Sequence, residues 1–192
     1  MSTHLTALHL LQQASPPSPP SGYTALSARS GDLLYTEDSA GVERLLAAGP
    51  TPVRLTSTTA STATTLSDAA GLGLAVQAGR RYLFRFAGQY ISAASTTGLG
   101  LAVNGPTLGS DGLMANVFIA HTNAIPMLGA VSAYNTAILG TASSTATRMP
   151  WEVWGHVHVS VSGTLQLRMR SEVASSAVTL QIGSYGYAWA VG

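Results

Sequence analysis

Three side chains in the C-terminal third of the sequence have the types and spacing of a metal site: Glu152, His156 and His158. In an extended strand, residues two apart point to the same side, about 6.5–7 Å from each other. Two imidazoles and a carboxylate on one face could therefore hold a metal ion, and in a symmetric oligomer the histidines of several chains could share one. No further ligand follows at a clear spacing. An ordinary polar sheet face is thus the favoured interpretation, and no cofactor is predicted.

A hydrolase triad can also be drawn, because serine is abundant and His121 could combine with Asp68 or Asp111. However, the sequence has no G-x-S-x-G turn that would expose a nucleophilic serine. Its carboxylates are also too few to pair in the way that glycosidases require. We therefore predict that the chain is not an enzyme.

Arginine supplies every basic side chain, and its densest cluster is Arg80, Arg81 and Arg85. Such a cluster could contact an anionic sugar or a capsid, or it could be a solvated edge paired with carboxylates. Arg168 and Arg170, which face the same way in an extended strand, leave the same alternatives open.

Trp154 lies three residues after Trp151, so the two indoles point to opposite faces of an extended strand. An exposed tryptophan can stack on a sugar or anchor a contact between subunits. We favour the subunit contact, and we assign Trp154, His156 and His158 to one trimer interface.

The composition indicates a chain that hides much of its surface against other chains. Of the 192 residues, 46% are hydrophobic, and only nine basic and eight acidic residues are charged. This 9% is far below the ~25% of an average soluble domain, and monomers depend on surface charge for solubility. A net charge of +1 argues against nucleic acid as a partner, and zero cysteine excludes disulfides. No apolar run of about 18 residues predicts membrane insertion.

From residue 51 to the end, hydrophobic residues recur with a period of two. About eight antiparallel strands joined by small-residue turns are typical of a β-sandwich or barrel, and we expect an all-β jelly-roll head domain over 51–192. The predicted loops are 88–97, 104–113 and 121–150. We expect six aromatic residues to fill the core: Tyr82, Phe84, Phe86, Trp151, Tyr187 and Trp189.

The N-terminal quarter has a different pattern. Residues 1–21 combine a leucine-rich stretch with a proline-rich spacer, which favours an extended arm that needs a socket. Residues 22–50 contain three short strand candidates and are too few to bury a core alone, so we expect a small β collar. The predicted anchoring residues are Leu5, Leu8, Leu11, Pro16, Pro17, Pro19 and Pro20.

Two segments carry a family resemblance. The first runs PPSGYTALSARSGDLLYTEDSAGVERLL, with a proline-rich lead, a Gly-aromatic strand, a Gly-Asp turn, a Leu-Tyr strand and an Asp-Ser-x-Gly turn. It resembles a short segment near the N-terminus of many tailed-bacteriophage fibre and decoration proteins. The second, LAVQAGRRYLFRFAGQYISAASTTGLGLAVNGP, resembles the jelly-roll domain that often follows, which is similar to the trimeric heads of tumour necrosis factor and C1q.

The resemblance implies a structural virion protein, on a head or a tail, that works as a homotrimer on the virion surface. Residues 1–50 would bind a capsid or tail protein, and distal loops would touch a host cell-surface glycan. A carbohydrate-binding module of an adhesin is the alternative, and a small hydrolase is a weaker one. The expected receptor-loop residues are Gln89, Tyr90, Asn104, His121, Asn123 and Tyr134.

Overall fold

A computed structural model describes residues 19–21, 23, 25–29, 33–37, 39–40, 43–47, 51–121, 126–140, 145 and 147–191. All regular elements of these residues are strands, which confirms the all-β prediction. No helix among them is long and apolar enough to cross a membrane. The chain divides into two compact units, Met1–Gly49 and Pro50–Gly192.

The smaller unit contains one antiparallel sheet of order β1-β2-β3. Its strands are β1 (Ala25–Arg29), β2 (Leu33–Glu37) and β3 (Glu43–Ala47), close to the three predicted candidates. The anchoring candidates Leu5, Leu8, Leu11, Pro16 and Pro17 lie outside the described residues. Pro19 and Pro20 precede β1, and the Pro20 carbonyl accepts a hydrogen bond from the Tyr23 N–H at 3.0 Å.

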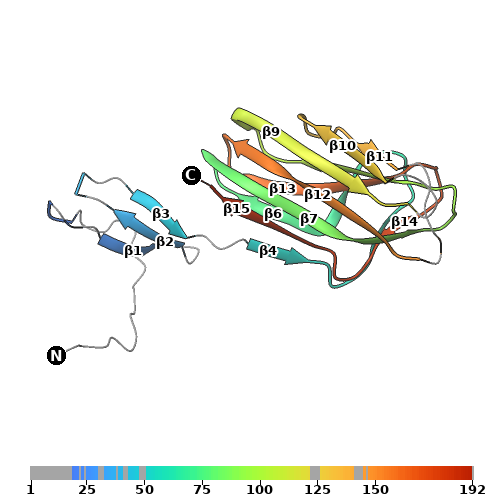
Figure 1. Cartoon of the computed structure of the whole chain (residues 1–192), viewed down its shortest axis with the longest axis horizontal. Helices are drawn as coiled ribbons and strands as arrows, with labels where there is room; N and C mark the ends of the chain where they lie inside the picture. The colour runs from blue at the N-terminus through green and yellow to red at the C-terminus, as the bar shows by residue number, and fades with distance from the viewer. Residues whose placement is uncertain are drawn as a thin grey trace. The chain divides into compact units, whose positions relative to one another are not determined.

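The larger unit consists of antiparallel strands in two sheets (Figure 1). The first sheet has the order β10-β9-β12-β7-β14-β5, and β15 pairs with both β7 and β4. Its strands are β4 (Thr51–Arg54), β5 (Thr59–Ser61), β7 (Arg80–Ser92), β9 (Leu108–Ile119), β10 (Met127–Val131), β12 (Met149–Val159), β14 (Val178–Leu180) and β15 (Tyr185–Ala190).

The second sheet has four strands in the order β11-β8-β13-β6. They are β11 (Ile138–Leu139), β8 (Leu99–Asn104), β13 (Gly163–Ser171) and β6 (Ser67–Val76). One continuous hydrophobic core takes side chains from both sheets, as a β-sandwich requires.

Alternation along the strands explains which side chains enter this core. In β7, Tyr82, Phe84 and Phe86 are buried, whereas Arg81 and Leu83, on either side of Tyr82, are exposed. In β13 the leucines and Met169 are buried and alternate with partly exposed Gln166, Arg168 and Arg170. Trp151 is buried on β12 as predicted, and Trp154 lies on the opposite face.

The prediction for the closing strand β15 was wrong. Tyr187 is only half-buried and Trp189 is 52% exposed, whereas Gly186 and Ala188 face the core. The reason is the neighbouring strand: a Cβ on Gly186 would lie 2.4 Å from the Phe86 ring. Because Phe86 already fills this part of the core, only a small residue fits there, and the aromatic residues of β15 point outward.

The predicted loops also need correction. Residues 88–92 continue strand β7, and 108–113 belong to β9. The segment 121–150 contains β10 and β11 and the first residues of β12. Alternating small residues in these stretches pair with neighbouring strands, so less chain remains for loops than predicted.

Candidate functional site

The outer face of the first sheet carries side chains in register across four strands. Strand pairing places Met114, His156, Leu83 and Trp189 in one row, and Asn116, Trp154, Arg85 and Tyr187 in the next. We call these eight residues, with Glu152, the aromatic face. Leu83 is 50% exposed and Met114 is 48% exposed, so large apolar groups meet solvent in the middle of a sheet.

An ion pair between Arg85 and Glu152 lies at the centre of the aromatic face. Arg85 approaches Glu152 with two nitrogens: Nε lies 2.7 Å from Oε1, and Nη2 donates to Oε2 at 3.1 Å. A hydrogen bond with Tyr187 and, to a smaller extent, one with Glu152 raise the pKa of Arg85. The one cation and the one carboxylate of this face therefore neutralise each other, and the surface they leave is neutral.

A pocket of about 360 Å³ opens beside this ion pair. Trp154 and Trp189 line it, with Leu83, Gly155 and Tyr187 among its other residues. The pocket is a recess in an aromatic surface, of a size that one inserted side chain or one sugar ring could fill.

One end of the sheet carries charge instead of aromatic rings. Arg81 donates a hydrogen bond to the Asp111 carboxylate, and the His158 Nδ1 lies 3.8 Å from the same carboxylate. The Arg81 guanidinium is the main reason that the pKa of Asp111 is lowered. The Nδ1 of His158 also accepts a hydrogen bond from the Asp111 N–H at 3.3 Å.

The three metal-ligand candidates are thus engaged separately. Glu152 binds Arg85, and His158 contacts Asp111, whereas His156 lies between Met114 and Leu83 in the strand register. No group of three metal-ligating side chains occurs within the described part of the chain.

The hydrolase candidates are not brought together either. His121 is 8% exposed and lies against Gly140. Asp68 pairs with Arg168 on β13, and Asp111 pairs with Arg81 on β7. Neither carboxylate forms an ion pair with His121 among the described residues.

The receptor-loop candidates are scattered. Tyr90 is fully buried in β7 and donates a hydrogen bond to the Ala120 carbonyl at 2.9 Å, so its placement in an exposed loop was wrong. Gln89 lies beside it in the same strand and is exposed. Burial raises the pKa of Tyr134 to about 12.

The remaining receptor candidates divide between the second sheet and the undescribed part. Asn104 ends β8, where its Oδ1 accepts a hydrogen bond from Asn135 at 3.2 Å. Asn123 lies outside the described residues.

Sequence reasoning did not identify Met114, Leu83 and Trp189 as members of one surface. The alternation of Leu83 with buried aromatic residues is visible in the sequence, but the residues beside Leu83 on neighbouring strands depend on strand pairing.

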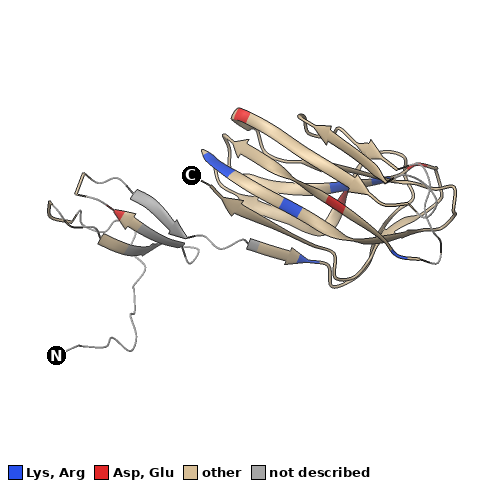
Figure 2. Ribbon diagram, viewed as in Figure 1, with Lys and Arg blue, Asp and Glu red and all other residues tan. Residues whose placement is uncertain are grey.

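Figure 2 shows the sparse charge of the larger unit, where most of the ribbon carries neither acid nor base.

No family model matches the chain. No curated protein matches its sequence either.

Proposed function

We propose that the chain is a structural protein of a tailed-bacteriophage virion, anchored by residues 1–50 and assembled as a homotrimer through the larger unit. The observation that carries the proposal is the aromatic face, where exposed aromatic and aliphatic side chains surround one neutralised ion pair on a nearly uncharged chain. The larger unit would form the projecting head, which would contact host surface glycans.

The strand order supports a jelly roll for this head. Eight strands, taken in chain order, are β4, β6, β7, β8, β11, β12, β13 and β15. With these numbered one to eight, one sheet has the order 1-8-3-6 and the other 2-7-4-5. This is the arrangement of two Greek keys in a jelly roll. The β9–β10 hairpin extends the first sheet beyond the sixth strand.

The size of the aromatic face supports burial against another chain. Four strands at ~4.8 Å and two rows of side chains at ~6.8 Å give an area on the order of 260 Å². An exposed patch of a few hundred Å² is often functional, and this one is about a third of the ~800 Å² that one partner contributes to a stable interface. In a cyclic trimer each chain uses two different surfaces, so the face would pack against a second region of its neighbour.

A second copy is the favoured occupant because the face is neutral. A basic or acidic partner would leave its own charges opposite the Arg85–Glu152 pair without a counter-charge. A surface of the same chain, with 9% charged residues, carries no such conflict.

The alternative is a carbohydrate-binding module, which the pocket between Trp154 and Trp189 favours. Indole rings stack on the apolar faces of sugars, and a monomer could use the pocket in this way. The two functions use the same side chains, so they cannot both occupy the aromatic face.

Light scattering during size-exclusion chromatography tests the proposal. The full chain of 19.7 kDa should elute at three times this mass from micromolar concentrations upward. A monomer over the whole range would overturn the trimer. A monomer whose tryptophan fluorescence responds to neutral oligosaccharides would establish the carbohydrate-binding module instead. A density map of the intact particle would then test the virion assignment by showing where residues 1–20 insert.

A further inference from the structure

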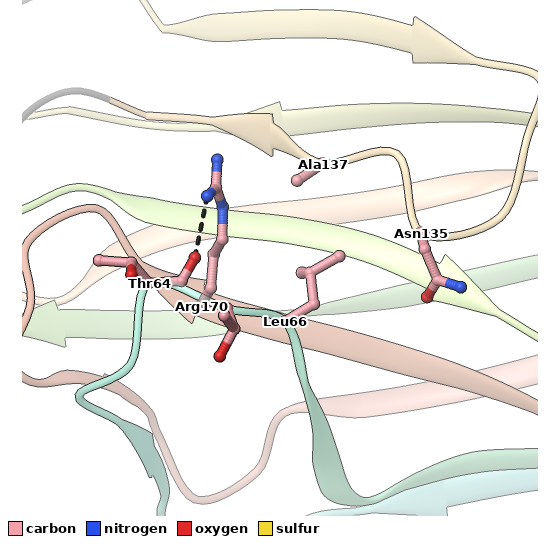
Figure 3. Close-up of a pocket in the computed structure, with 6 residues that line it drawn as sticks. Thr64, Leu66, Asn135, Ala137 and Arg170 are labelled. Carbon is pink, nitrogen blue, oxygen red and sulfur yellow. Dashed lines mark hydrogen bonds between the residues drawn. The ribbon is translucent and has the colours of Figure 1, made fainter.

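The outer face of the second sheet holds a pocket that the sequence analysis did not identify. Its volume is about 360 Å³, and six residues line it: Thr64, Thr65, Leu66, Asn135, Ala137 and Arg170. They come from the connection between β5 and β6, the connection between β10 and β11, and strand β13. Figure 3 shows Arg170 standing beside Thr64, with Leu66 between Arg170 and Asn135.

Two arginines on β13 have different roles at this pocket. Arg168 bonds to both connections: its Nη1 donates to the Asn135 Oδ1 at 2.7 Å, and its Nη2 donates to the Leu66 carbonyl at 2.8 Å. Its Nε lies 3.0 Å from the Asp68 carboxylate, which compensates the charge. Arg168 therefore ties together the two connections that form the walls of the pocket.

Arg170 has no such compensation. Its Nη1 donates to the Thr64 carbonyl at 2.9 Å, and no carboxylate of the described residues forms an ion pair with it. The Nε is buried without a hydrogen-bond partner in the structure. Of the four N–H groups on its terminal nitrogens, the Thr64 carbonyl uses one, so three remain for a ligand.

The Arg170 side chain is also held in place. Strand pairing sets it opposite Gly100 on β8. A Cβ on Gly100 would lie 2.7 Å from the Arg170 Cγ and 3.1 Å from its Nε, so the arginine stem lies directly across the glycine. This contact fixes the guanidinium before any ligand arrives, which reduces the entropy that binding must overcome.

The lining selects the chemistry of the ligand. A guanidinium pairs with a carboxylate through two parallel hydrogen bonds. One uncompensated positive charge matches the single negative charge of a carboxylate, whereas a phosphate monoester carries −1.5 to −2. The hydroxyl groups of Thr64 and Thr65 can bond to sugar hydroxyls, and Leu66 and Ala137 offer apolar contact to a ring. The volume lies at the lower end of small-molecule pockets, at the scale of one ring.

We propose that this pocket binds the carboxylate of an acidic sugar residue, such as a hexuronic acid, through Arg170. The proposal rests on the proposed function only for its assumption that the head contacts glycans, and it names their class. The pocket and the aromatic face lie on different sheets, so burial of the aromatic face does not by itself cover the pocket.

Saturation-transfer difference NMR on the full chain tests the site, with methyl glucuronide as the probe and methyl glucoside as its neutral match. Methyl glucuronide should bind with a Kd on the order of 1 mM, and methyl glucoside at least tenfold more weakly. Acetate and inorganic phosphate, added as competitors that displace methyl glucuronide, distinguish a sugar site from a general anion site. Binding of either as tightly as methyl glucuronide would overturn the sugar assignment.

Three variants locate the binding. R170Q should weaken methyl glucuronide binding at least tenfold, because it removes the cation. A137W should have the same effect by filling the pocket while the charge remains. R54Q, which removes an exposed arginine from the other sheet, should bind as the parent does. Unchanged binding in R170Q and A137W would overturn the site.

Light scattering on the same samples separates this proposal from the proposed function. A trimer that ignores methyl glucuronide overturns the pocket alone. A monomer that binds it through Arg170 overturns the assembly alone.

Discussion

The two outer faces of the larger unit differ in how their arginine side chains are paired. On the first sheet, Arg85 is paired with Glu152 and surrounded by Trp154, Tyr187 and Trp189. On the second sheet, Arg168 is bound to Asp68 and to two loops, but Arg170 has only a backbone carbonyl as its partner among the described residues.

This difference indicates what each face can meet. A neutralised charge within aromatic surroundings can be buried against a protein without leaving a charge unpaired. A charge with unused donors is stable only where water or an anion completes its hydrogen bonds. The first face therefore suits a neighbouring chain, and the second suits solvent and an anionic ligand.

The largest effect is expected from a charge placed on the first face. Leu83→Glu adds a second carboxylate to the centre of the aromatic face, where Arg85 is already paired with Glu152, and its burial should weaken self-association by at least about 100-fold. Sedimentation velocity at micromolar concentration should show a monomer. Ala75→Glu makes the same change at an exposed position of the second sheet and should leave the oligomer intact. Equal loss in both variants would remove the distinction between the faces.

A smaller effect separates the two arginines of β13. Arg168→Gln breaks one part-buried hydrogen bond and two contacts with exposed partners, which together should lower the free energy of unfolding by about 2 kcal/mol. The melting temperature should fall by roughly 4–8 °C in a thermal scan. Arg170→Gln, the matched control, should change stability by less than about 1 kcal/mol. The reverse order would contradict a structural role for Arg168.

Gly100→Ala tests whether ligand binding on the second sheet depends on the position of the Arg170 side chain. The new methyl group collides with the Arg170 stem and displaces the guanidinium, so methyl glucuronide binding should weaken about fivefold with little change in stability. Titration followed by NMR measures the affinity. In the double variant with Arg170→Gln, Gly100→Ala should add nothing. Additive losses would mean that Gly100 acts elsewhere than through Arg170.

The smallest effect concerns the charged end of the first sheet. The pKa of Asp111 is lowered in the folded chain, so the unfolded chain binds its proton first as the pH falls. The stability that Asp111 provides is complete above about pH 4 and disappears as the pH falls further, through the folded pKa. Thermal scans between pH 7 and pH 3 should therefore show a slightly shallower decline for Asp111→Asn. An identical decline would show that the Arg81 contact contributes no measurable stability.

Local pattern was sufficient for much of the fold. Alternation in β7, β12 and β13 predicted which residues are buried, because one face of a strand meets a core whatever its neighbours are. The three strands of the smaller unit were also predicted, since turn residues separate them clearly. The loops were overestimated because small residues in β9 and β10 give little hydrophobic contrast between the two faces.

The candidate sites were less predictable. Glu152, His156 and His158 were correctly placed on one strand, but their partners Arg85 and Asp111 come from two other strands. The Arg170 pocket combines a strand with two connections that are distant from it in the chain. Sequence spacing carries no information about such neighbours.

The amino-acid sequence by itself determined that this chain is all-β, that few of its residues are charged, and which side of most strands is apolar. Only the tertiary structure decided that Tyr187 and Trp189 face outward. Period-two patterning gives two faces but does not say which one is buried when both are apolar. Phe86 occupies the volume above Gly186, and the packing of that ring, rather than hydrophobicity, chose the orientation of β15.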